Sequence, residues 1–402
     1  MCVERTTLIM SKKNLIERDR DRERLTVQEN AHNILLSKKK YFYPNKIDKT
    51  IEIVIVPKLA DITANQKNVG IVLDEKLVLK ILSKRYRNVS ITEINTENDL
   101  KKLALRKPDL VFSGVKYFYF DGGIIWLNDY LELYDISYIA SNREALHNEH
   151  DKSIAKKIMQ KANIKTADFF TTEPGEHLTE MSIPIAFPLF IKPLTGGDSR
   201  GVDKNSIVYD FLSFQAKVLD IKRKQNLRSL VETYLPGKEY SVSILQDNSN
   251  GNLKAMPIEI VVDKNINGHC ILDYDIKKND QEKVIAVTDN KIYNQLSDLS
   301  KDAFKALDGK SLGRIDIKMN HNGVPHFIEA NLMPGLRNGY FYRSCLLNLN
   351  IDSFTPGKIS NKSKVEGEYG KPFLIKVLFI TPSRSKNIAF LIYSFLIILK
   401  KI

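Results

Sequence analysis

Residues 313–331 read GRIDIKMNHNGVPHFIEAN, with apolar and polar residues alternating on both sides of Asn322-Gly323. An Asn-Gly pair between two alternating runs predicts a β-hairpin with a two-residue turn. Counting outward from that turn places Asp316 directly opposite Glu329. Two facing carboxylates with Cβ atoms about 5 Å apart repel each other unless a cation lies between them.

The same count places Arg314 opposite Asn331. Because side chains alternate along a strand, these four polar residues share one face, and the other face carries Ile315, Ile317, Ile328 and Ala330. The two carboxylates and the Asn331 amide offer three oxygen ligands of the kind that magnesium prefers, although a solvated polar face shows the same alternation. Pro325 predicts some irregularity in the second strand.

Length and composition suit a soluble protein of two or three domains. The chain has 402 residues, 43% hydrophobic content and a formal net charge of +13. The charge invites a nucleic-acid or acidic-membrane partner, but no zinc-finger or aromatic RNA-binding motif accompanies it, so no nucleic acid is expected. Anionic small molecules such as nucleotides suit the charge equally. The three widely spaced cysteines fit a reducing cytoplasm.

The two ends of the chain differ from its middle. Residues 1–50 form a charged N-terminal extension whose mixed run at 17–24 is typical of a solvated helix or a disordered arm. Residues 351–402 form a polar linker and an apolar tail at 388–399. Twelve apolar residues fall short of the roughly 20 that a membrane-spanning helix needs. A docked terminal helix or strand is favoured, with weak membrane-surface contact as the alternative.

Strands and helices alternate over residues 51–142, which predicts a parallel α/β domain. The predicted strands are 51–57, 89–94, 109–112 and 137–140, and the predicted helices are 77–85, 100–106 and 127–134.

The predicted strand at 187–192 ends on Lys192 and is followed by a glycine-rich loop. The loop contains Gly196, Gly197 and Gly201. Glycines let backbone N–H groups converge on an anion while the lysine adds a positive charge. The spacing matches neither the P-loop nor the dinucleotide fingerprint, and a plain surface hairpin remains an alternative.

Two further carboxylates, Glu232 and Glu239, flank a turn between predicted strands within 229–245. Another strand is predicted at 255–262, a polar loop at 272–278, and a helix at 293–307.

Taken together, these motifs resemble the ATP-grasp superfamily, and most closely its D-alanine–D-alanine ligase branch. The resemblance runs from about residue 108 to 340 and rests on five stretches in the family's order: 151–152, 191–201, 231–240, 273–277, and 313–316 with 328–335. It implies an α/β (α+β) ATP-grasp fold with an N-terminal parallel, Rossmann-like domain at 51–142. The ATP-grasp subdomains would span 143–240, with the glycine-rich lid, and 241–350, with the metal hairpin.

The resemblance implies an ATP site. The residues that would bind ATP are Lys152, Lys192, Gly197, Asp198, Glu232, Tyr234, Leu235 and Glu239. Lys152 and Lys192 would contact the phosphates, Glu232 the adenine amino group, and Glu239 the ribose hydroxyls.

It also implies the catalytic groups. Two Mg²⁺ ions, with Mn²⁺ as a substitute, would be bound by Asp316, Glu329 and Asn331. Arg314 would stabilise the tetrahedral intermediate, Lys277 would reach the phosphates from a loop, and Ser199 belongs to the lid. The implied reaction joins a small carboxylate to an amino-acid amine through an acyl phosphate. A homodimer is an expectation of the family.

Parts of the substrate pocket depart from the family pattern. Residues 113–123 replace a His-Gly-rich loop, and Arg337, Asn338 and Tyr340 stand where the family uses small hydroxyl residues. A substrate pair other than two D-alanines is therefore expected. The alternatives are a nucleotide-binding regulatory protein without ligase turnover, a polyanion binder, and an ATP-grasp enzyme that activates another carboxylate such as bicarbonate.

Overall fold

The computed structural model describes residues 46–55, 71, 73–197, 199–247, 251–265, 268–336 and 339–349. Most of the predicted N-terminal extension, Asp198 and the predicted tail at 351–402 lie outside these residues. Among the described helices, none combines the length and apolar character that crossing a membrane requires.

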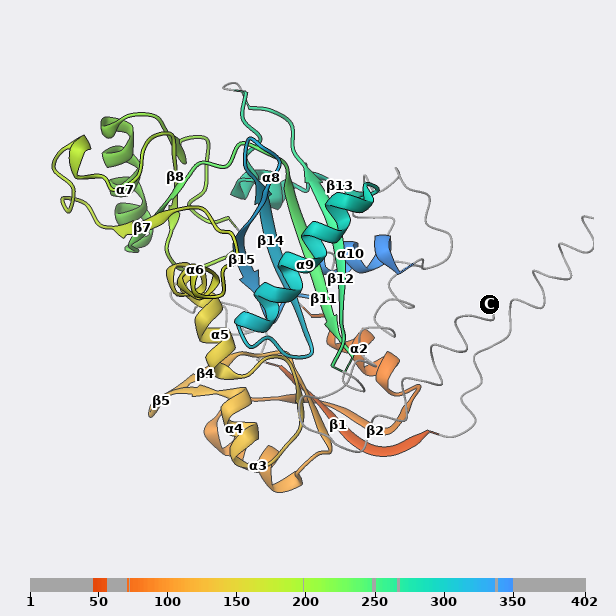
Figure 1. The fold of residues 1–402 in the computed structure, drawn as a ribbon. Helices are drawn as coiled ribbons and strands as arrows, with labels where there is room; N and C mark the ends of the chain where they lie inside the picture. Colours follow the sequence, from red (N-terminus) through yellow and green to blue (C-terminus); the bar gives the residue numbers. More distant parts are fainter. Residues whose placement is uncertain are drawn as a thin grey trace, which may run out of the picture. The chain divides into compact units, whose positions relative to one another are not determined.

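A four-stranded parallel sheet opens the described chain, with strand order β2-β1-β3-β6 (Figure 1). Its strands are β1 (Ile47–Ile55), β2 (Tyr86–Glu93), β3 (Leu110–Ser113) and β6 (Tyr138–Ile139). The intervening helices are α2 (Glu75–Leu82), α3 (Glu97–Arg106) and α4 (Leu127–Leu133). The predicted parallel α/β arrangement is confirmed, although β1 begins four residues before the predicted strand. A hairpin of β4 (Tyr117–Phe120) and β5 (Gly123–Trp126) was not predicted.

A second sheet is antiparallel, with strand order β7-β10-β8-β9. Its strands are β7 (Phe169–Thr172), β8 (Leu189–Pro193), β9 (Ile207–Val208) and β10 (Ser229–Thr233). The helix α7 (Phe211–Gln225) packs Phe214, Val218 and Ile221 onto the buried apolar side chains of this sheet. The helices α5 (Arg143–His150) and α6 (Lys152–Lys161) precede it, and η1 (Glu180–Ser182) lies in the loop after β7.

The third sheet is also antiparallel, with strand order β13-β12-β11-β14-β15. Its strands are β11 (Glu239–Gln246), β12 (Leu253–Val261), β13 (Lys283–Ala286), β14 (Leu312–Met319) and β15 (Pro325–Asn331). One face packs on α9 (Asn290–Ala306), and the other on α10 (Tyr340–Asn348), because alternate side chains of β11 and β12 enter two different cores.

The β14–β15 hairpin has a three-residue loop, His321-Asn322-Gly323, so the predicted two-residue turn is wrong. The Asn320 backbone N donates to Val324 O at 3.0 Å, and Gly323 has a φ of +70°. Asn320 Oδ1 accepts hydrogen bonds from the backbone N of Asn322 and of Val324, each at 3.0 Å. The Asn320 side chain closes this loop, and Gly323 occupies the position that requires a left-handed backbone conformation.

A β-bulge restores the predicted pairing further from the loop. Near the loop, Ile317 lies opposite Phe327, one residue away from the predicted partner. The register then shifts between Asp316 and Ile317, which leaves Ile328 as the extra residue. The predicted opposite pairs are therefore present, Asp316 with Glu329 and Arg314 with Asn331.

The bulge also changes the direction of one side chain. Ile328 was predicted to point away from the polar face, but it lines the same pocket as Glu329. Ile315 and Ile317 do point away and are fully buried against the α9 face, as predicted. The irregularity predicted from Pro325 is thus present in β15, at Ile328.

The predicted polar loop at 272–278 is in fact mostly a short helix, α8 (Tyr274–Asn279). Asp273 caps it, because its side chain accepts a hydrogen bond from Ile276 N at 2.9 Å. The loop prediction is wrong because it overlooked Asp273, and Asp is a preferred N-cap residue at the start of a helix.

We expect Gly237→Ala to lower the free energy of unfolding by about 2 kcal/mol. A Cβ at Gly237 would lie 2.6 Å from Met319 O and 2.9 Å from Asn320 O, and these backbone atoms belong to the β14–β15 hairpin. Urea denaturation measures the effect. Gly197→Ala is the matched control, because its Cβ would meet nothing within 4 Å, and it should stay within about 0.5 kcal/mol. Equal stabilities of the two variants would refute the packing argument.

Candidate active site

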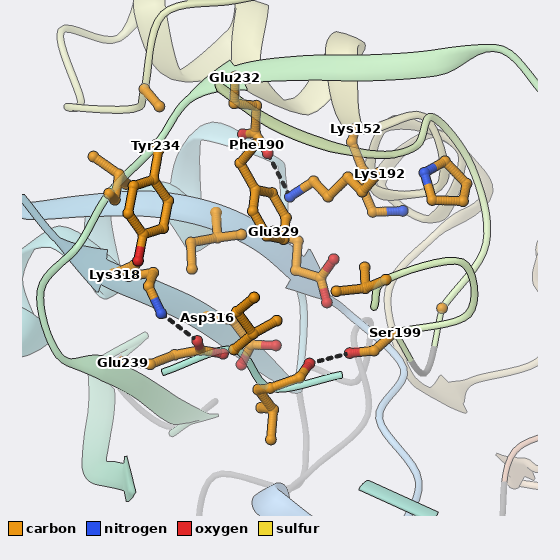
Figure 2. A pocket seen from close by; sticks show the side chains of 18 of the residues that line it. Lys152, Phe190, Lys192, Ser199, Glu232, Tyr234, Glu239, Asp316, Lys318 and Glu329 are labelled. Carbon is orange, nitrogen blue, oxygen red and sulfur yellow. Dashed lines mark hydrogen bonds and ion pairs between the residues drawn. The ribbon is translucent and has the colours of Figure 1, made fainter. Parts of the chain in front are cut away.

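One pocket lies between the second and third sheets and measures about 920 Å³, including the part open to solvent. Figure 2 shows side chains of β8, β10, β11, β14 and β15 converging on it. Eleven of the predicted site residues line it: Lys152, Lys192, Gly197, Ser199, Glu232, Tyr234, Leu235, Glu239, Lys277, Asp316 and Glu329. Arg314 and Asn331 occupy the adjoining part of the hairpin, opposite each other.

Two buried lysines stand on one side of the pocket. Lys152 begins α6 and donates through Nζ to Gly196 O at 2.7 Å, which links the helix to the glycine-rich loop. Burial lowers the pKa of Lys152, while the Glu329 carboxylate acts in the opposite direction. Burial would also lower the pKa of Lys192, but Glu232 and Glu329 outweigh it, so the pKa of Lys192 is raised.

Glu232 is buried between two ammonium groups. Its Oε2 lies 2.8 Å from Lys192 Nζ (Figure 2). Its Oε1 lies 2.5 Å from Lys156 Nζ. Burial alone would raise the pKa of Glu232, but the two lysines hold it at about 2. Lys156 was missed in the sequence, although it lies one helical turn after Lys152 and so on the same side of α6.

This ion pair makes stability depend on pH. The pKa of Glu232 is about 2 in the folded chain, below its ordinary value of 4.5. The stabilisation that the two lysines provide through Glu232 is therefore complete above pH 4.5 and is lost as the pH falls toward 2. The difference corresponds to about 3 kcal/mol. Between pH 7 and pH 3, we expect the wild-type free energy of unfolding, from urea denaturation, to fall about 2 kcal/mol further than that of Glu232→Gln. Parallel pH profiles would contradict this.

The polar face of the β14–β15 hairpin forms the floor of the site. Arg314 binds Asp316 through two hydrogen bonds, Nε to Oδ1 at 3.0 Å and Nη2 to Oδ2 at 2.9 Å. Ser241 Oγ also donates to Asp316 Oδ1 at 2.7 Å. Burial would lower the pKa of Arg314, but Asp316 and then Glu329 outweigh it and raise it.

Glu329 is a buried carboxylate close to four cationic side chains. Burial would raise its pKa, but the positive charges of Lys152, Lys192, Lys277 and Arg314 outweigh burial and lower the pKa of Glu329. It therefore stays ionised at neutral pH.

The predicted metal ligands contain two carboxylates and one amide. Within the described residues, no group of three His, Cys, Asp or Glu side chains could hold a metal ion. Asp316 and Glu329 face each other across the two strands, and Asn331 Oδ1 accepts from Met333 N at 3.2 Å. Oxygen donors of this type fit a hard cation such as Mg²⁺, with Asn331 completing the donor set.

A largely apolar slot forms the other end of the pocket. It is lined by Phe190, Tyr234, Leu235, Ile271, Leu272 and Ile328. At its edge, Lys318 Nζ donates to Glu239 Oε2 at 2.9 Å and to Cys270 O at 3.3 Å. Lys318 was missed in the sequence, because only the pairing of β11 with β14 brings it beside Glu239.

The glycine-rich loop is tied to the opposite wall. Ser199 has a φ of +56°, and its hydroxyl donates to Leu272 O at 3.0 Å. Lys277 on α8 lies with Nζ 5.7 Å from the ring centre of Tyr340. Residues of the loop and Lys277 of α8 line the same pocket.

Comparisons with known proteins agree with this architecture. A family model described as "D-ala D-ala ligase C-terminus" matches residues 158–348. D-alanine–D-alanine ligases from Aquifex aeolicus and Flavobacterium psychrophilum are 28% and 30% identical to the chain. These matches cover 65% and 52% of this chain and 84% and 62% of the relatives.

Two solved structures share the fold. The Bacillus anthracis D-alanine–D-alanine ligase complexed with ATP has a TM-score of 0.53 at 21% identity and covers 72% of this chain and 88% of its own. The VanG D-Ala:D-Ser ligase of Enterococcus faecalis has a TM-score of 0.55 at 16% identity, with 83% and 99% covered.

The sheets, the pocket and these likenesses define an ATP-grasp fold. Within that class, the chain is D-alanine–D-alanine ligase-like, because residues 158–348 match the C-terminal domain of those ligases, and it is an ATP-dependent ligase of this general type.

Proposed function

We propose that the chain joins a small carboxylate to an amino-acid amine through an acyl phosphate formed from ATP. The observation that carries this proposal is the pair of facing carboxylates, Asp316 and Glu329, set among buried cations at one end of an apolar slot. A nucleotide has the same division into an apolar base and anionic phosphates.

The charge of the pocket supports a polyanionic ligand. Five cationic side chains and four carboxylates line it: Lys152, Lys192, Arg200, Lys277 and Lys318 with Glu232, Glu239, Asp316 and Glu329. Two further cations, Lys156 and Arg314, lie directly against Glu232 and Asp316. The surplus of positive charge favours binding of a triphosphate.

The proposed ATP orientation places the phosphates among the cationic side chains of the pocket and the base in the apolar slot. Lys152 and Lys192 bind the phosphates under the loop that contains Gly197. The base lies in the apolar slot, where Glu232 accepts a hydrogen bond from its amino group and the backbone around Tyr234 and Leu235 completes the pocket. Glu239 binds the ribose hydroxyls through the carboxylate that Lys318 orients. The nucleotide then lies between residues 143–240 and 241–350, the predicted ATP-grasp subdomains.

Asp316, Glu329 and Asn331 would hold the two Mg²⁺ ions, which would offset charge on the transferring phosphoryl group. Lys277 and the two phosphate-binding lysines add fixed positive charge to the same region. In the first step, a substrate carboxylate oxygen bonds to the γ-phosphorus and the bond to the ADP oxygen breaks.

In the second step, the amine nitrogen attacks the carbonyl carbon of the acyl phosphate, loses a proton, and phosphate departs. Arg314 stabilises the oxyanion that develops on the carbonyl oxygen. Its position is fixed by the two hydrogen bonds to Asp316. The contact between Ser199 and Leu272 O supports a closed glycine-rich loop that keeps water from the acyl phosphate.

We propose that the substrate pair differs from two D-alanines. On the acceptor side, the ring of Tyr340 lies 5.7 Å from the guanidinium carbon of Arg314, where the family uses a small hydroxyl residue. The chain also departs from the family's His-Gly-rich loop. A structural neighbour is itself a D-Ala:D-Ser ligase, so the fold accommodates more than one pair.

The experiment that tests this function measures phosphate release from ATP with Mg²⁺ across a panel of D- and L-amino acids and small carboxylates. We expect release that requires one particular acid and one particular amine, with the amide detected by mass spectrometry. ATP binding without release across the whole panel would favour a nucleotide-binding protein without turnover.

A further inference from the structure

Lys156 is a fully buried lysine to which the proposed reaction gives no role. Its exposed fraction is 0%, and it is among the largest fully buried side chains of the described chain. Its Nζ lies 2.5 Å from Glu232 Oε1, donates to Thr166 Oγ1 at 2.6 Å and lies 5.5 Å from the ring centre of Phe169. Burying an ammonium group is costly, so these partners must offset the cost.

The effect of Lys156 on the pocket is electrostatic. Glu232 is shared between Lys156 and Lys192, one on each carboxylate oxygen. Without Lys156, Glu232 would be free to turn both oxygens toward Lys192 and would neutralise the positive charge proposed to bind phosphate. With Lys156 present, the three buried groups keep a net positive charge beside the pocket.

Lys156 also fixes the direction of the carboxylate. Thr166 Oγ1, which accepts from Lys156, itself donates to Phe327 O at 2.9 Å on β15. Lys156 therefore holds Glu232 on β10 relative to the strand that carries Glu329. A carboxylate has about four lone-pair positions, so Glu232 can accept one more hydrogen bond from a ligand while both ammonium groups stay bound.

We propose that Lys156 is a positioning residue that sets nucleotide-base selectivity, by holding the Glu232 carboxylate as a fixed acceptor for the amino group of a purine. The inference rests on the proposed function, in which Glu232 meets the base. An oxygen at position 6 of the purine would face this carboxylate with lone pairs only, so a 6-oxo purine such as that of ITP should be rejected.

The test measures dissociation constants for ATP and ITP by calorimetry, without requiring turnover. We expect wild type to bind ATP about tenfold or more tightly than ITP, the range of a hydrogen bond to a charged group. Lys156→Met should bring the two constants to within about threefold and weaken ATP binding. Lys157→Met is the matched control, since Lys157 is exposed on the same helix, and it should keep the wild-type ratio.

Three outcomes would overturn the inference. The first is equal affinity of wild type for ATP and ITP, a measurement that does not depend on the folding of any variant. The second is a Lys156→Met protein that keeps the wild-type ratio, even with both affinities lowered, because a purely structural role changes both constants together. The third, where Lys156→Met does not fold, is an unchanged ratio in Lys156→Gln, which keeps a donor but loses the charge. A failed substrate screen leaves these binding constants interpretable, so failure of the proposed ligase reaction remains distinguishable.

Discussion

Glu329→Gln is expected to lower kcat for ATP-dependent ligation by about a thousandfold. Glutamine keeps the size of the side chain but removes the negative charge, which would weaken the metal site proposed at Asp316, Glu329 and Asn331. The charge of Glu329 also balances Lys152, Lys192, Lys277 and Arg314, which lower its pKa in the folded chain. Steady-state phosphate release with saturating Mg²⁺ measures the loss.

ATP affinity separates this catalytic effect from general damage to the pocket. Without added metal, Glu329→Gln should bind ATP at least as tightly as wild type, because a carboxylate facing the phosphates has been removed. Glu259→Gln is the matched control. Glu259 lies on β12 of the same sheet, pairs with Lys238 and is absent from the pocket wall, so the variant should keep normal turnover. Turnover of Glu329→Gln within tenfold of wild type would refute the proposed metal site.

Arg314→Lys is expected to lower kcat by about a hundredfold or more while changing the KM for ATP by less than about threefold. Lysine keeps the charge but cannot make the two parallel hydrogen bonds that now hold the guanidinium against Asp316. The positive charge would then be displaced from the developing oxyanion. A split between kcat and KM, measured at saturating carboxylate and amine, is the diagnostic result.

Arg143→Lys is the control for this substitution. Arg143 is exposed on α5 and pairs only with Asp129 among the ion pairs of the described residues, at 3.1 Å. It should leave kcat unchanged. Equal kcat values for Arg314→Lys and wild type would show that Arg314 acts only through its charge or is remote from the reacting carbonyl.

The hairpin shows how far sequence reasoning reaches in this fold. Alternation around Asn322-Gly323 predicted the strands and the opposite pairs at the site, and both are present. The predicted turn was wrong by one residue. Pro325 predicted an irregularity in this strand but not its position at Ile328, and the bulge there reverses the one-residue shift, so the predicted pairing is correct again at Asp316. Side-chain capping by Asn320 and a bulge depend on local hydrogen bonds that strand periodicity does not encode.

Eleven of the 24 pocket residues were predicted, because they lie at recognisable places: a strand end, a glycine-rich loop, a turn. Lys156 and Lys318 were not, since each looks like an ordinary lysine until the fold brings its partner close. Glu232 is 76 residues from Lys156, and Glu239 is 79 residues from Lys318 along the chain. Sequence spacing on one element identified the groups that lie close together locally, whereas ion pairs between elements distant in the sequence required the structure.

The acyl phosphate is the central claim, and isotope transfer tests it most directly. Once the carboxylate is known from the screen, it is supplied with ¹⁸O in its carboxyl group together with ATP, Mg²⁺ and the amine, and the released phosphate is analysed by mass spectrometry. The proposed mechanism predicts that each phosphate carries one oxygen from the carboxylate. Phosphate without ¹⁸O, formed alongside the amide, would contradict it and show that the carboxylate never bonds to the γ-phosphorus.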